Sequence, residues 1–82
     1  MSLKDLIEAN VKAIVDDTEN IRVTEEVTPT GFKYEVAVAK DDVGRLIGVE
    51  GRNAKALRTI LRAAASKENV RVVFNILKTP IE

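Results

Sequence analysis

The chain has 82 residues, with 13 basic and 13 acidic side chains, so its formal net charge is zero and a protein that coats nucleic acid unspecifically is disfavoured. It contains neither Cys nor His, which excludes a disulfide framework, thiolate chemistry and the most common metal ligand. With 45% hydrophobic residues it can form one small domain over residues 1–82, and a domain of this size is only marginally stable unless it packs well or oligomerises.

The first predicted element is a helix from about Leu3 to Val15. Its apolar residues recur at helical spacing, and Ser2 followed by Asp5 fits an N-terminal capping box. The acidic residues that begin at Asp16 would oppose the dipole at the helix C-terminus, so the helix should end there.

Two strands should follow as a hairpin. Apolar residues alternate from Ile21 to Val27 and again from Phe32 to Val38, with the turn at Pro29–Gly31 between the two runs. The aromatic residues fall on the apolar phase of their strands, so we expect them in the core and not as stacking platforms for bases; they are Phe32, Tyr34 and Phe74.

A short helix, a Gly-x-x-Gly turn and a long helix are predicted next. Asp42 is expected to cap the short helix and Gly48 to end it. Gly51 precedes the long helix, where a missing Cβ would let another backbone come close. Such a turn directs free N–H groups and the positive end of a helix dipole at a phosphate. Paired glycines alone usually only make turns, so the residues on either side have to indicate whether this turn is a binding loop.

The long helix is predicted to divide into two faces. Leu57, Ile60, Leu61 and Ala64 form an apolar stripe, and Arg52, Lys55, Arg58 and Arg62 fall on the other side. The only acid between Arg45 and Arg62 is Glu50, whereas an ordinary exposed face mixes both signs. Residues 1–39 carry a net charge of −4 and residues 40–82 a net charge of +4. A functional basic face is therefore favoured over an ordinary solvated one.

The last predicted element is a third strand with apolar residues from Val70 to Ile76, and Pro80 should end the regular structure. The element order is α-β-β-α-α-β. It predicts an α+β fold with a three-stranded mixed sheet covered on one face by helices, in which the second and third strands are parallel and joined by a right-handed crossover.

The segment Ile47–Arg52 resembles the I-G-x-x-G-R motif of KH domains, and Arg52–Arg62 is similar to the small stand-alone bacterial KH proteins of the KhpA-like family. The resemblance covers nearly the whole chain, and it implies a type II (prokaryotic) KH domain. It also implies a cytoplasmic, single-stranded-RNA-binding protein that acts as a bacterial RNA chaperone or post-transcriptional regulator. The partners it implies are a second copy of the chain or a larger Jag-like KH protein.

Carried over by position, the resemblance implies a set of RNA-binding residues: Arg45, Ile47, Gly48, Val49, Glu50, Gly51, Arg52, Asn53, Lys55 and Arg58. The glycines would hold the turn, and Arg45, Arg52 and Lys55 would neutralise phosphates. Val43, Leu46 and Ile47 would line the groove, although core packing is the more economical role for Leu46. The loop departs from the family at Val49 and Glu50, which stand where basic or polar residues are frequent, and this favours weak RNA binding or binding borne by the helix cations.

Two other classes of function compete with RNA binding. A KH fold that serves as a protein-interaction module with weak or no RNA affinity is supported by Val49, Glu50 and the zero net charge. An enzyme is disfavoured because Thr59 and Ser66 have no His or Cys partner. No cofactor motif, metal-ligand cluster, signal peptide or apolar run of about 18 residues is present, so a cytoplasmic protein without a membrane segment is expected.

Overall fold

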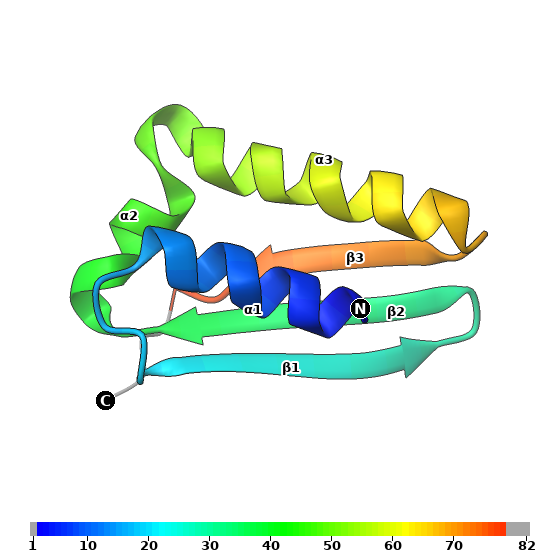
Figure 1. The fold of residues 1–82 in the computed structure, drawn as a ribbon, viewed down its shortest axis with the longest axis horizontal. Helices are drawn as coiled ribbons and strands as arrows, with labels where there is room; N and C mark the ends of the chain where they lie inside the picture. The colour runs from blue at the N-terminus through cyan, green and yellow to red at the C-terminus, as the bar shows by residue number, and fades with distance from the viewer. Residues whose placement is uncertain (1, 79–82) are drawn as a thin grey trace.

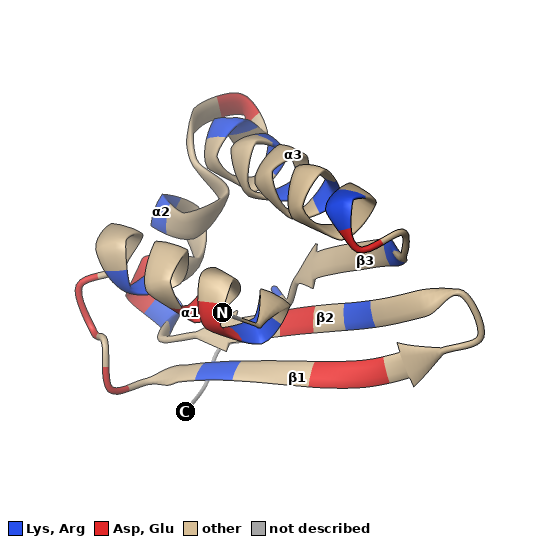
Figure 2. Cartoon of the chain, turned by 45° about the vertical axis from the view of Figure 1, so that its right-hand side comes forward, with Lys and Arg blue, Asp and Glu red and all other residues tan. Residues whose placement is uncertain are grey.

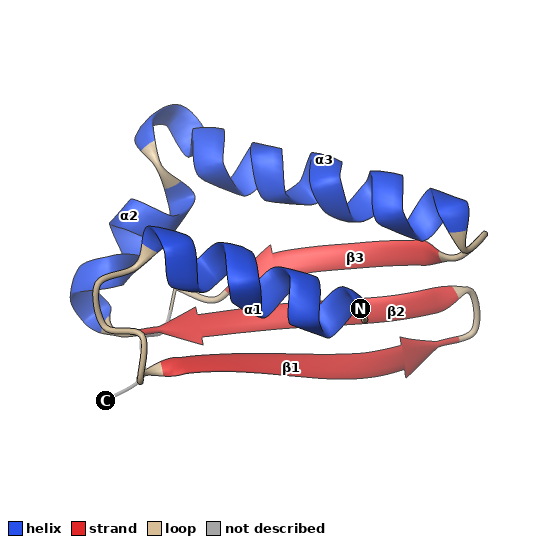
Figure 3. Cartoon of the chain, in the orientation of Figure 1, coloured by secondary structure: helices blue, strands red, loops and turns tan. Residues whose placement is uncertain are grey.

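The computed structural model describes residues 2–78, and the predicted stop at Pro80 lies outside them. Figures 1 and 3 show the elements, which follow the predicted order. They are α1 (Leu3–Ile14), β1 (Ile21–Thr28), β2 (Gly31–Val38), a 3₁₀ turn (Lys40–Asp42), α2 (Val43–Ile47), a second 3₁₀ turn (Val49–Gly51), α3 (Arg52–Lys67) and β3 (Arg71–Ile76). Ser2 caps α1 as predicted, since its Oγ accepts a hydrogen bond from the Asp5 N–H at 3.1 Å.

The sheet has the order β1-β2-β3, so β2 lies at its centre. β1 and β2 are antiparallel, from the pair Ile21 and Val38 to the pair Thr28 and Gly31. β3 runs parallel to β2 and begins where Arg71 pairs with Gly31. The predicted mixed sheet is therefore confirmed, and one edge of β3 is left without a strand partner among the described residues.

The helices cover one face of the sheet, as Figure 1 shows for α1 and α3. The core between the two layers contains buried residues from α1, β2, α2, α3 and β3. Its largest fully buried side chains are Tyr34, Ile7, Leu46, Leu61, Val11, Val36 and Val38. The α+β class is confirmed, and so is the core role preferred for Leu46.

The buried face of α3 differs from the predicted stripe. Ala54, Leu57, Leu61 and Ala65 are buried, whereas Ile60 is 40% exposed and the prediction for it is wrong. At roughly 100° per residue, Ile60 lies about 105° from the centre of the buried face, on its flank. Arg58 and Arg62 lie on the opposite flank by the same count, so these two cations face sideways and not directly away from the core.

Gly31 lies directly against the start of β3. A Cβ at this position would lie 1.9 Å from the backbone oxygen of Arg71, a distance that no side chain can occupy. The Arg71 N–H also donates a 3.1 Å hydrogen bond to the Thr30 carbonyl. The hairpin turn and the start of β3 are thereby held against each other.

Candidate nucleic-acid interface

The loop between α2 and α3 has a backbone that favours glycine at two places. Gly48 has φ 80° and Gly51 has φ 75°. A Cβ on Gly48 would also lie 2.9 Å from the Asn53 backbone nitrogen, whereas one on Gly51 would meet nothing closer than Lys55 Cε at 4.0 Å. The close approach expected at Gly51 is therefore wrong, because it occurs at Gly48. Glu50 adopts φ 57° between them, which an L-residue tolerates less readily.

The tip of this loop presents free backbone donors. Val49 is 75% exposed, and Glu50 is exposed as well. Gly48 N–H donates to Gly44 and Gly51 N–H to Gly48, but among the described residues the N–H groups of Val49 and Glu50 have no hydrogen-bond partner. Unpaired amides next to the N-terminus of a 16-residue helix favour an anion.

Asn53 fastens the loop to the helix before it. Its Nδ2 in the first turn of α3 donates to the Arg45 carbonyl in α2 at 2.9 Å. This bond satisfies one of the carbonyls that a helix C-terminus leaves unpaired. The side chain assigned to RNA by resemblance is thus engaged in holding the two helices at a fixed separation across the loop.

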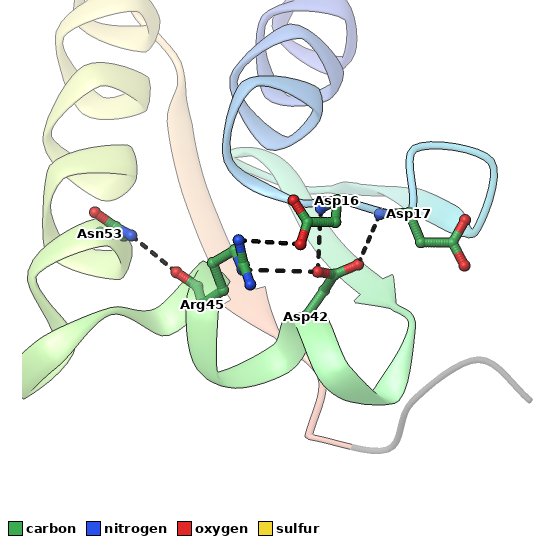
Figure 4. A network of polar contacts seen from close by, with 5 residues as sticks. All are labelled: Asp16, Asp17, Asp42, Arg45 and Asn53. Carbon is green, nitrogen blue, oxygen red and sulfur yellow. Dashed lines mark hydrogen bonds and ion pairs between the residues drawn. The ribbon is translucent and has the colours of Figure 1, made fainter.

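Asp42 holds the segment that follows α1, as Figure 4 shows. Its carboxylate is buried and accepts from the Asp16 N–H at 3.1 Å and from the Asp17 N–H at 3.0 Å. It makes no capping bond to α2, so the predicted cap is wrong. A cap would satisfy only local amides, whereas these two hydrogen bonds join Asp42 to residues that lie 26 and 25 positions earlier in the chain.

Arg45 belongs to the same network. Its Nη1 lies 3.1 Å from Asp16 Oδ2, and its Nε lies 3.9 Å from Asp42 Oδ1. A phosphate at Arg45 would have to compete with two carboxylates. The structure therefore places this predicted phosphate ligand near the loop but pairs its charge within the protein.

The cations of α3 have different surroundings. Figure 2 shows basic positions along α3 and acidic positions on β1 and on the segment between α1 and β1. Arg52, Lys55 and Arg62 are exposed, and Arg58 is half-buried, with its Nε donating to the Phe74 carbonyl at 3.2 Å. Among the described residues none of these four cations has a carboxylate within ion-pair distance.

A cavity of about 240 Å³ lies beside the loop, between α3 and the end of β3. The predicted site residues Ile47, Gly51, Lys55 and Arg58 line it. Its other lining residues were not predicted from the sequence; they are Ala54, Asn75, Ile76 and Lys78. A signal for the last three was present, because a strand parallel to β2 must bring its carboxyl end to the same edge of the sheet as α2.

Within residues 2–78, one titratable group has a clearly shifted pKa, and it lies outside this cavity. Burial, together with a 2.7 Å hydrogen bond to Glu25, raises the pKa of Tyr34 far above its ordinary value. Tyr34 is 1% exposed and stays a neutral donor within the core. It therefore has no role in the cavity, and Phe74 is also buried, as predicted for the aromatic residues.

The fold and this loop define the class of protein. A three-stranded mixed sheet covered by helices, with a Gly-x-x-Gly loop between two of them, is a KH domain of the type II arrangement. The family model described as "KhpA/KhpB, KH domain" matches residues 4–76. The chain belongs to this family, as the motif predicted.

The curated relatives are similar in length as well as in sequence. The chain is 41% identical over 75 residues to the RNA-binding protein KhpA of Clostridium perfringens, covering 92% of this chain and 100% of that protein. It is 43% identical over 75 residues to the protein of the same name from Clostridium acetobutylicum, with the same coverage. For the KhpA of Listeria monocytogenes the identity is 40% over 76 residues, covering 93% of this chain and 100% of that protein. The expectation of a non-enzymatic protein agrees with the names of these bacterial relatives.

No solved structure matches the chain significantly. Within residues 2–78, no group of three or more acidic residues is placed to hold a metal ion. None of the helices in that range has the length and apolar character needed to cross a membrane.

Proposed function

We propose that this protein binds single-stranded RNA in the cleft between the Gly48–Gly51 loop, α3 and β3. The observation that carries the proposal is the charge of the cleft. Lys55, Arg58 and Lys78 line the cavity beside the loop, and no carboxylate does, although the chain as a whole has no net charge. A polyanion is attracted to such a local excess of cations.

The cleft offers contacts for both the phosphates and the bases of an RNA strand. The free amides of Val49 and Glu50 and the ammonium of Lys55 face the phosphates, as in KH loops that clamp about four nucleotides. Ile47 and Ile76 provide apolar contact for the bases, and Asn75 offers an amide for base edges. A single strand is required, because the bases of a duplex are not free to enter a cleft.

The proposal extends to the biological setting. The curated relatives carry the name RNA-binding protein, and a small domain without a catalytic constellation suits a cytoplasmic RNA chaperone or post-transcriptional regulator. These roles require release as well as capture of RNA. The anionic Glu50 at the loop tip supports weak, reversible binding.

We further propose pairing with a second copy or with a larger Jag-like KH protein. A domain this small gains stability by burying surface against another chain. In the alanine-rich Ala63–Ala65 segment, Ala65 packs in the core, but Ala63 is exposed and Ala64 is half-buried near the exposed Ile60. Sedimentation that shows only monomer at high micromolar concentration would remove the homodimer.

A protein-interaction module with little RNA affinity is the competing function. The observations that favour it are the exposed Val49 and the carboxylate of Glu50 at the loop tip. The two functions differ in the salt dependence of RNA binding. Protein docking alone predicts no RNA affinity that falls with ionic strength.

The test compares two double variants with the same change in charge. Arg52→Gln with Lys55→Gln removes two cations beside the loop, and Lys4→Gln with Lys12→Gln removes two exposed cations of α1. For the unmodified protein we expect a log–log slope of affinity against salt of about −2 to −3. The loop-side variant should weaken binding and make this slope shallower by about 1.4, whereas the α1 variant should change neither. Affinity that is independent of salt would reject the basic cleft as the RNA site.

A further inference from the structure

The cleft beside the loop continues along α3. A second cavity of about 190 Å³ shares Arg58 and Asn75 with the first. A third, of about 670 Å³, shares Arg62, Val72 and Val73 with the second. The three cavities therefore lie in a row along β3, from the loop to the turn between α3 and β3, and we call this row of cavities the channel.

The far end of the channel is also suited to an anion. Arg62 and Arg71 line it, together with the polar side chains of Thr30, Ser66 and Asn69. No carboxylate lines any of the three cavities. Both arginines are exposed, and neither forms an ion pair or a side-chain hydrogen bond within residues 2–78.

The backbone under these arginines is well anchored. Arg71 N–H donates to Thr30 at 3.1 Å, and Val70 N–H donates to the Ala65 carbonyl at 3.1 Å. Gly31 leaves no space between β2 and the start of β3. Arg71 is therefore presented from a fixed strand end, and less ordering is needed when a ligand binds.

We propose that the channel holds RNA beyond the four nucleotides at the loop, with Arg62 and Arg71 as a second pair of phosphate ligands. This inference rests on the proposed function. Lys55 and Arg62 are separated by two turns of α3, or about 10 Å at 1.5 Å per residue. At 3.4 Å or more between successive phosphates of a strand, that distance accommodates at most about three further nucleotides.

The experiment compares two lengths of oligouridylate, four and eight nucleotides, on the full chain. Arg62→Gln with Arg71→Gln should weaken binding of the eight-nucleotide RNA about tenfold and leave the four-nucleotide RNA within about twofold. Lys4→Gln with Lys12→Gln is the control of equal charge change and should affect neither length. Thermal melts establish that all variants are folded.

A second measurement needs no variant. The unmodified protein should show a log–log salt slope for the eight-nucleotide RNA that is steeper by about 1.4 than for the four-nucleotide RNA, which corresponds to two additional phosphate contacts. Equal slopes, or a double variant that weakens both lengths equally, would overturn the extended site and leave the loop site intact. Binding of neither RNA by the unmodified protein would overturn the proposed function and the extended site together.

Discussion

The two sides of the Gly48–Gly51 loop have opposite electrostatic surroundings. On the α2 side, Arg45 lies 3.1 Å from Asp16 and within 4 Å of Asp42, so its charge is paired within the protein. On the α3 side, Lys55 lines a channel without a carboxylate. The neighbours of a cation, and not its residue type or its distance from a motif, therefore decide whether it is available to a phosphate.

The same comparison explains how a chain of zero net charge can present a basic site. The acids are concentrated in residues 1–39, which include α1, the following turn and the whole hairpin of β1 and β2. The β3 edge lies on the other side of β2 from β1, and the middle cavity of the channel is lined there by residues of α3 and β3 alone. The sheet therefore separates the charges in space as the sequence separates them along the chain.

The orientation of α3 about its axis places its cations along the channel. The variants that test this orientation have the largest expected effect. Leu61 is 1% exposed, so Leu61→Ala should lower the free energy of unfolding by about 2–5 kcal/mol. Ile60 is the matched control, because its 40% exposure predicts a loss of about 1 kcal/mol or less for Ile60→Ala. Urea unfolding measures both. A loss below about 0.5 kcal/mol for Leu61→Ala would mean that α3 is rotated and that its cations do not line the channel.

The Asp42 network should have the next largest effect. Asp42→Ala removes the acceptor of two backbone N–H groups and the buried partner of Arg45, so we expect a loss of about 2–3 kcal/mol in unfolding free energy. Asp41→Ala removes a neighbouring exposed carboxylate and should cost less than about 0.5 kcal/mol. Equal melting temperatures for the two variants would contradict a structural role for the Asp42 carboxylate.

A smaller effect compares the two sides of the loop directly. Lys55→Gln should weaken RNA binding severalfold and make the salt slope shallower by about 0.7, because one phosphate contact is lost. Arg45→Gln should leave the affinity and the slope nearly unchanged, because this guanidinium already faces two carboxylates. Both side chains are exposed, so both variants should fold. An Arg45 variant that loses as much affinity as the Lys55 variant would remove the distinction between the two sides.

Local patterns in the sequence were sufficient for most of the fold. The alternation in the two hairpin strands and the helical spacing from Leu3 predicted elements that the structure confirms. The Gly-x-x-Gly motif and the element order also predicted the family that residues 4–76 match. These features depend on neighbours in the chain, which a single sequence displays.

The errors occurred where distant segments meet. Asp42 was assigned to its own helix, but its partners are the amides of Asp16 and Asp17. Ile60 matched the helical period, but the width of the buried face depends on how α3 packs, and the structure buries Ala54 and Ala65 instead. Neither the contact of Asp42 with the segment after α1 nor the packing of α3 can be inferred from the spacing of residues along the chain.

The lining of the cavity beside the loop could be predicted only in part, for the same reason. The loop residues and the cations of α3 are close in sequence, and Ile47, Gly51, Lys55 and Arg58 meet around one cavity. Asn75 and Lys78 join them only through the parallel pairing of β3 with β2. The pairing of Arg45 with Asp16 depends on the path of the chain after α1, which composition does not reveal.

The most direct test of the central claim is the RNA affinity of Val49→Lys with Glu50→Gln. Both residues are exposed at the loop tip, and both glycines remain. Gln, like Glu, is unbranched at Cβ, so the change at position 50 adds no backbone strain at the φ of 57°. The local charge rises by two units beside the free amides. With equal thermal melts, a short unstructured RNA should bind the double variant more tightly and with a steeper dependence on salt than the unmodified protein. Unchanged affinity in the folded variant would mean that RNA does not cross this loop, and the protein-interaction function would then be favoured.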